Sequence, residues 1–294
     1  MQRTIQKPAE AWGIGLHSGN PVQLALRPAP VDSGIVFTRT DLPGQPAIRV
    51  SHEAVHETTL STTMEGPDGF KVATVEHLMS ALYGMGIDNL YVELNAPEVP
   101  VFDGSAAPYM YLLEESGIML QERPKKLIKV MREVRVENGP KWAMLKPDDR
   151  FSLTVGIDFG HPLIPHQQQR FEVTRELYRR GIARARTFCF QDDVEKMQSY
   201  GLAKGGGLDN AVVVGDFSVL NPEGLRFKDE FIRHKTLDCI GDLYMNGYPI
   251  IGAFEAHMPG HGLNNQLLRT LLGDPLNWRF IEAPADSDIL PLSA

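Results

Sequence analysis

Apolar and polar residues alternate in short runs along the first third of the chain, with the period of two that is typical of β-strands. Residues 22–26 (VQLAL) and 34–38 (GIVFT) follow this pattern, and Pro- and Gly-rich stretches separate them. Short apolar runs later in the chain predict further strands at 90–94, 127–130, 151–155 and 250–254. We therefore expect β-sheet in both halves of the chain.

Four other segments have apolar residues at helical spacing. In residues 74–83 the apolar stripe consists of Val75, Leu78, Met79 and Leu82, and Thr74 stands where an N-cap residue is expected. A second helix is predicted to end near Glu115, before Gly117. Two more helices are predicted at 229–244 and 264–272.

The two halves repeat the same order of elements. A shift of 161 residues places the L-Y-x-x-G motif of 82–86 on that of 243–247, and each copy ends a helix and precedes a strand and another helix. The same shift places His77 on Asp238. If the two helices pair across an axis between the halves, these side chains would approach each other.

We therefore expect an α+β protein of two domains with similar topology, each a β-sheet with helices packed on one face. The length of 294 residues suits one large domain or two ordinary ones, and the repeat favours two. The predicted N-terminal domain spans residues 1–122 and the C-terminal domain residues 125–285. The Q-E-R-P stretch at 121–124 is typical of a linker, and residues 286–294 form a tail.

Composition narrows the classes of partner and compartment. The 29 Lys+Arg and 37 Asp+Glu give a net charge of −8, which argues against nucleic acid, because a basic face normally neutralises phosphates. Two cysteines, Cys189 and Cys239, cannot form a disulfide framework, so a reducing compartment is expected. The start of the chain lacks a signal-peptide pattern, and no window approaches the roughly 18 apolar residues of a spanning helix. We expect a cytoplasmic protein without a membrane-spanning segment.

The R-H-K-T-L-D segment at 233–238 carries the strongest local signal for chemistry. His234 and Asp238 are four residues apart, so on a helix both side chains reach a single ion. Zinc hydrolases commonly use three such ligands and a water molecule, and His77 is the natural third ligand because of the repeat. Its neighbour Glu76 would then accept a proton from the water. A surface ion pair and a core histidine are the alternative explanation.

Two further segments have both a chemical and an ordinary interpretation. His261 stands between glycines in a turn before a helix. A protonated imidazole there can donate a proton to a leaving amine, but an ordinary turn histidine is the alternative. Arg184 and Arg186 precede Thr187 and Phe188, a combination suited to an anion and a sugar or base, or to a solvated strand edge. The glycines at 205–207 indicate a hinge more than a phosphate-binding loop, since no Lys-Ser/Thr follows.

Taken together, several motifs resemble those of the UDP-3-O-acyl-N-acetylglucosamine deacetylases, which carry out the committed step of lipid A synthesis in Gram-negative bacteria. The similarity extends from the first motif to the last predicted helix. The motifs are GIGLHSG at 13–19, TVEHL at 74–78, GIDN at 86–89, DGSAAP at 103–108, ARARTF at 183–188, HK-x-LD-x-IGDL at 234–243 and GH-x-LNN at 260–265.

The resemblance implies a catalytic Zn²⁺ between the two domains and the small-molecule substrate UDP-3-O-acyl-GlcNAc. It implies that the region 188–214 is an insert that forms a passage for the acyl chain. It implies that His77, His234 and Asp238 bind the metal, that Glu76 is the general base, and that His261 is the acid or electrostatic partner, oriented by Asp242. It also implies that Thr187 contacts the oxyanion, that Phe188 packs on the glucosamine ring and that Lys235 contacts the substrate near the metal. For His17 it implies only a position close to the cleft.

Two positions depart from the family pattern. Family members carry a lysine that contacts the diphosphate two residues before the glycine of the Gly-His turn, and here that residue is Met258. Many members also carry a cysteine where this chain has Ser61, a change that would alter inhibition by excess metal. A zinc amidase for another sugar and a catalytically silent lipid- or nucleotide-binding module are the alternative functions. We expect a monomer, and the residues do not distinguish Zn²⁺ from Fe²⁺ or indicate the acyl length.

Overall fold

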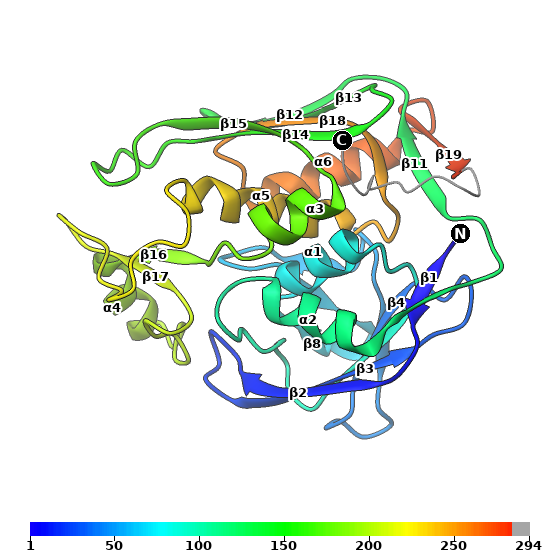
Figure 1. The fold of residues 1–294 in the computed structure, drawn as a ribbon, viewed down its shortest axis with the longest axis horizontal. Helices are drawn as coiled ribbons and strands as arrows, with labels where there is room; N and C mark the ends of the chain where they lie inside the picture. The colour runs from blue at the N-terminus through cyan, green and yellow to red at the C-terminus, as the bar shows by residue number, and fades with distance from the viewer. Residues whose placement is uncertain (284–294) are drawn as a thin grey trace.

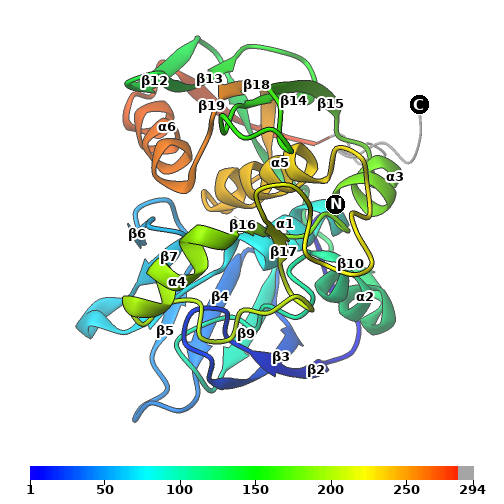
Figure 2. The same ribbon diagram turned by 90° about the vertical axis from the view of Figure 1, so that its left-hand side faces the viewer.

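The computed structural model describes residues 1–283, so the predicted tail at 286–294 lies outside the described residues. Two large β-sheets form the outer layers of the molecule, and the long helices lie between them (Figure 1). Figure 2 shows the same succession of sheet, helices, helices and sheet from the side. The predicted α+β class is confirmed.

The N-terminal sheet has five strands and one pair of parallel neighbours. Only β9 and β4 run parallel, and the other neighbours are antiparallel. Helices α1 (Glu76–Met85) and α2 (Ala107–Ser116) cover the inner face of this sheet (Figure 1). In spatial order the strands are β2 (Ala9–Ile14), β3 (Pro21–Pro28), β9 (Leu90–Leu94), β4 (Ile35–Arg39) and β5 (Ala47–Arg49).

The C-terminal sheet contains the same arrangement of five strands. Among these five strands only β18 and β14 run parallel, and helices α5 (Glu230–Tyr244) and α6 (His261–Gly273) lie on the inner face of the sheet. The two halves therefore share one topology, as the repeat predicted, whereas the domain boundaries stay a prediction. The strands are β12 (Val134–Asn138), β13 (Lys141–Lys146), β18 (Ile250–His257), β14 (Phe151–Ile157) and β15 (Gln167–Glu172), and β11 (Lys126–Val130) and β19 (Trp278–Glu282) extend the sheet beyond β18.

Shorter elements connect the halves and flank the helices. The segment that contains α4, β16 and β17 projects to one side of the layered body (Figure 1). The short strands are β1 (Arg3–Ile5), β6 (Val55–Glu57), β7 (Thr63–Glu65), β8 (Lys71–Val72), β10 (Ile118–Leu120), β16 (Phe188–Phe190) and β17 (Val212–Val214). The remaining helices are η1 (Pro67–Gly69), α3 (Arg175–Leu177), the π-helix η2 (Tyr178–Ile182) and α4 (Gln191–Ser199).

Helices α1 and α5 pack directly against each other in the centre of the molecule. A Cβ atom on Gly241 would lie 2.0 Å from the carbonyl oxygen of Glu76, so only glycine permits this approach. Tyr83 and Tyr244, which the repeat aligns, meet edge to face with ring centroids 5.5 Å apart. Every residue of α1 is buried, so its ionisable side chains need partners inside the protein.

Two helix starts differ from the sequence prediction. Thr74 is not an N-cap: its φ of 59° lies in the left-handed region, and its hydroxyl donates to Glu98 Oε1, 3.0 Å away. Val75 precedes the helix instead, without a side-chain cap. Helix α6 begins at His261 rather than near residue 264, so this histidine opens the helix instead of lying in a turn before it.

Candidate metal centre and active site

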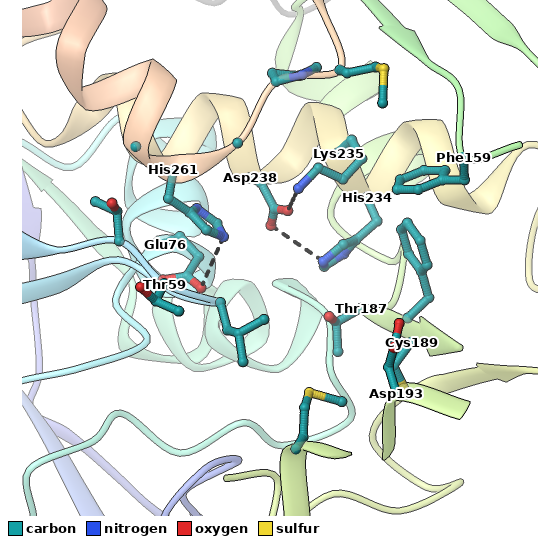
Figure 3. A pocket seen from close by; sticks show the side chains of 18 of the residues that line it. Thr59, Glu76, Phe159, Thr187, Cys189, Asp193, His234, Lys235, Asp238 and His261 are labelled. Atoms are coloured by element: carbon teal, nitrogen blue, oxygen red, sulfur yellow. Dashed lines mark hydrogen bonds and ion pairs between the residues drawn. The ribbon is translucent and has the colours of Figure 1, made fainter. Parts of the chain in front are cut away.

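Except for Asp242, the residues predicted to carry the chemistry line one cavity of about 920 Å³ between the two halves. Its volume lies within the range of small-molecule sites. Figure 3 shows Glu76 and His261 on one side, the side chains of α5 in the centre, and Thr187, Cys189 and Phe159 on the other side. The cavity takes residues from both halves, because α1 and α5 meet at its floor.

His77, His234 and Asp238 converge in this cavity and are all buried. One candidate ligand atom from each lies within 4.8 Å of the others. Asp238 Oδ1 is 3.3 Å from His234 Nε2 and 3.6 Å from His77 Nε2. The alternative of a surface ion pair is wrong, since His234 is 2% and Asp238 4% exposed.

The donor set fits a bound metal ion. His234 Nδ1 is 3.0 Å from the carbonyl oxygen of Ala185, a contact that places the ring hydrogen on Nδ1 and the lone pair on Nε2. That lone pair faces Asp238 Oδ1, a buried oxygen that accepts no hydrogen bond from any described residue. Two electron-pair donors that face each other in the interior are unfavourable unless a proton or a metal ion lies between them, and a metal ion would satisfy both at once. A third buried nitrogen, His77 Nε2, completes a ligand set that Zn²⁺ commonly takes.

The charges around the three residues favour the ligand forms. Burial lowers the pKa of His234 to about 4, so the ring is neutral at pH 7. Burial would raise the pKa of Asp238, but the positive charge that His234 carries at low pH and the charge of Lys235 hold it well below its usual value. Lys235 Nζ donates to Asp238 Oδ2 at 2.7 Å, which leaves Oδ1 for a metal.

Glu76 and His261 face each other beside the candidate metal centre. His261 Nε2 lies 4.0 Å from Glu76 Oε1, and its Nδ1 lies 2.9 Å from Asp242 Oδ2. Burial would lower the pKa of His261, but the charge and hydrogen bond of Asp242, together with Glu76, raise it to about 9. Burial raises the pKa of Glu76 against the opposing charges of His261 and His77. A proton acceptor and a protonated donor thus lie side by side.

The segment before Thr187 is held against α5 by a buried ion pair. Arg186 Nε donates to Glu230 Oε1 at 2.9 Å, and the same oxygen accepts from the Arg186 backbone N–H at 3.0 Å. Arg186 neither lies at a solvated strand edge nor is free to bind an anionic ligand, because it is 2% exposed and paired with a carboxylate. Arg184 is exposed, as expected for a solvated edge. The Arg186–Glu230 pair fixes the backbone on both sides of Arg186. This backbone includes the Ala185 carbonyl oxygen, which accepts a hydrogen bond from His234, and it carries Thr187 into the cavity.

The remaining predicted residues also line the cavity. Thr187 and Phe188 lie at its wall, where the Phe188 ring is 6.2 Å from that of His234. His17 lines it from the N-terminal half, and neither of its ring nitrogens has a hydrogen-bond partner among the described residues. Burial lowers the pKa of His17 against the charge of Glu98, so a neutral ring is favoured. Met258 lines the cavity too, with φ of 51°.

Sequence reasoning missed several residues that line the cavity or support the side chains in it. Phe159 packs edge to face on Phe188 with ring centroids 5.4 Å apart, and Lys141 reaches the cavity from the start of β13. Thr62 contacts both Glu76 and Asp242. Phe159 lies just beyond an apolar strand and Thr62 within a threonine-rich stretch, so neither has a local signal of its own. Met197, Tyr200 and Leu202 line the side formed by α4.

The fold and the site define a hydrolase with a candidate metal centre between two topologically equivalent halves. The chain belongs to the LpxC family, described as UDP-3-O-acyl N-acetylglycosamine deacetylase, whose model matches residues 2–273. The activity of this family is the deacetylation step of lipid A biosynthesis, so the resemblance inferred from the motifs is confirmed.

Similar proteins carry the corresponding name. The UDP-3-O-acyl-N-acetylglucosamine deacetylase of Chromobacterium violaceum is 50% identical over 299 residues, covering 99% of this chain and 98% of that protein. The protein of the same name from Shewanella sp. (strain W3-18-1) is 48% identical over 290 residues, covering 98% of this chain and 95% of its own length. Among residues 1–283, no helix combines the length and apolar character needed to cross a bilayer.

Proposed function

We propose that this chain is a zinc-dependent deacetylase that uses Glu76 as general base and His261 as general acid. The reaction is hydrolysis of the N-acetyl group of UDP-3-O-acyl-GlcNAc by water, giving UDP-3-O-acyl-glucosamine and acetate. The observation that carries the proposal is Asp238 Oδ1, a buried oxygen without a donor that faces two histidine nitrogens beside a buried carboxylate.

Zn²⁺ held by His77, His234 and Asp238 would polarise the acetamide carbonyl and make a water molecule more acidic. Glu76 accepts a proton from the attacking water as the water oxygen forms a bond to the carbonyl carbon. Thr187 donates its hydroxyl hydrogen to the oxygen on which negative charge develops. His261 Nε2 then gives a proton to the amide nitrogen as the C–N bond breaks, and Asp242 stabilises the charged ring through Nδ1.

The substrate would lie along the cavity, with the sugar near the metal. Phe188 would pack on the glucosamine ring, and His17 would meet the substrate from the opposite half. Because Met258 supplies no charge, we assign the contact with the diphosphate to Lys235 and Lys141, which line the same cavity. The acyl chain would pass along α4, where Met197, Tyr200 and Leu202 supply apolar surface.

The direct test is acetate release from UDP-3-O-acyl-GlcNAc by the purified protein, with metal analysis of the same samples. We expect activity in the protein as isolated, loss after dialysis against a chelator, and recovery when Zn²⁺ is restored. A parallel addition of Fe²⁺ shows which ion supports the higher kcat. Full acetate release by metal-free protein would contradict the proposal. Cytoplasmic location, a monomeric state and the lack of nucleic-acid binding stay predictions from the sequence.

A further inference from the structure

Thr62 lies at the boundary between the two halves and contacts both members of the proposed acid–base pair. It precedes β7, is 2% exposed, and donates its backbone N–H to Glu76 Oε2 at 2.9 Å. Its hydroxyl donates to Asp242 Oδ1 at 2.6 Å, a contact between residues 180 positions apart. One residue of the N-terminal half thus contacts the proposed base and the carboxylate that holds the proposed acid.

The carboxylate of Asp242 has donors on both of its oxygens. Oδ2 accepts from Asn264 Nδ2 at 2.8 Å and lies 2.9 Å from His261 Nδ1. Oδ1 is 3.1 Å from the same ring nitrogen, so Thr62 provides its shorter hydrogen bond. Because a buried carboxylate oxygen without a donor is unfavourable, losing the Thr62 hydroxyl would favour rotation of the carboxylate toward its remaining donors.

We propose that Thr62 is a positioning residue for the deacetylation. Its hydroxyl fixes the plane of the Asp242 carboxylate, and that plane fixes the direction in which His261 Nε2 faces the leaving nitrogen. The hydrogen bond from the Thr62 backbone N–H to Glu76 holds the proposed base, Glu76, in a fixed position relative to the proposed acid, His261. The inference rests on the proposed function, in which His261 is the acid, and Thr62 acts through Asp242 rather than on the substrate.

Thr62→Val tests the inference, because it keeps the shape of the side chain and the backbone bond to Glu76 while removing the hydroxyl. We expect kcat to fall about 10- to 100-fold, as for the loss of one hydrogen bond to a charged group, with KM changed less than about twofold. Thr62→Ser keeps a hydroxyl and should restore most of kcat. Thr40→Val is the matched control, since the Thr40 hydroxyl donates to Leu94 O at 3.1 Å, away from the cavity.

A double-mutant cycle with Asp242→Asn separates positioning from a general loss of stability. If Thr62 acts through Asp242, adding Thr62→Val to Asp242→Asn costs much less than it costs in the wild type. Fully additive losses, equal losses in the Ser and Val variants, or an unchanged kcat in Thr62→Val would each overturn the inference. If the Val variant does not fold, Thr62→Ala replaces it. Failure of the proposed function is distinguishable, since the wild type itself would then release no acetate.

Discussion

The central helices of the two halves, α1 and α5, occupy equivalent places in the fold and carry different chemistry. Position 77 of α1 and position 238 of α5 coincide under the shift of 161 residues, and each supplies a candidate metal ligand, His77 and Asp238. The neighbouring positions diverge, because Glu76 is the proposed base whereas Leu237 is an apolar core residue. A repeated scaffold therefore places two candidate ligands at equivalent positions beside the candidate metal centre, and the residues that differ between the two helices have different proposed roles.

Loss of His234, the other candidate ligand on α5 besides Asp238, should have the largest effect on metal content and activity. In His234→Gln the metal content of the purified protein should fall to background, and acetate release with it, because two protein ligands hold a metal much more weakly than three. His56→Gln is the control, since His56 is exposed and pairs with Glu65. A variant that kept one metal per chain at wild-type affinity would contradict the ligand role of His234.

Substitution of Glu76, the residue of α1 whose counterpart in α5 is Leu237, should lower the catalytic rate without loss of the metal. Glu76→Gln should lower kcat by about 10²- to 10⁴-fold, as is typical when a general base is removed, while the metal content stays at the wild-type value. The equivalent residue of α5 has no such role, so Leu237→Met should retain kcat within about tenfold. Steady-state acetate release and metal analysis test both variants. Wild-type kcat in Glu76→Gln would remove the base assignment.

The contact between the two helices should be sensitive to a single methyl group. Gly241→Ala places a Cβ atom 2.0 Å from the Glu76 carbonyl oxygen, so we expect a loss of about 1–3 kcal/mol in the free energy of unfolding. Gly273→Ala is the matched control, because no atom lies within 4 Å of the added Cβ. Urea unfolding of both variants measures the difference. Equal stability of the two would show that the helices do not approach as closely as described.

The smallest expected effect is a shift in pH dependence. In the proposed mechanism His261 acts in its protonated form, so activity should be present below its pKa of about 9 and lost as the pH rises through that value. The charge of Asp242 raises this pKa, so Asp242→Asn should move the alkaline limb of the kcat/KM profile to lower pH. A limb that stayed in place would assign it to another group.

The repeat and the motifs made much of this predictable, since local patterns determine helices such as 229–244 and the shift aligned His77 with Asp238. The predictions failed where tertiary contacts decide. Thr74 lost its predicted role as a cap because Glu98 binds its hydroxyl. Arg186 proved buried because Glu230, one turn before His234, lies opposite it. Thr62 had no local signal, because its partner Asp242 is 180 residues away.

The central claim is that residues from both helices share one metal ion. Anomalous diffraction at the zinc absorption edge from crystals of the zinc-loaded protein tests it most directly. We predict one peak in the cavity, about 2.0–2.2 Å from His77 Nε2, His234 Nε2 and an oxygen of Asp238. A zinc-loaded crystal with no peak between these three atoms, or with zinc bound by other residues, would contradict the account.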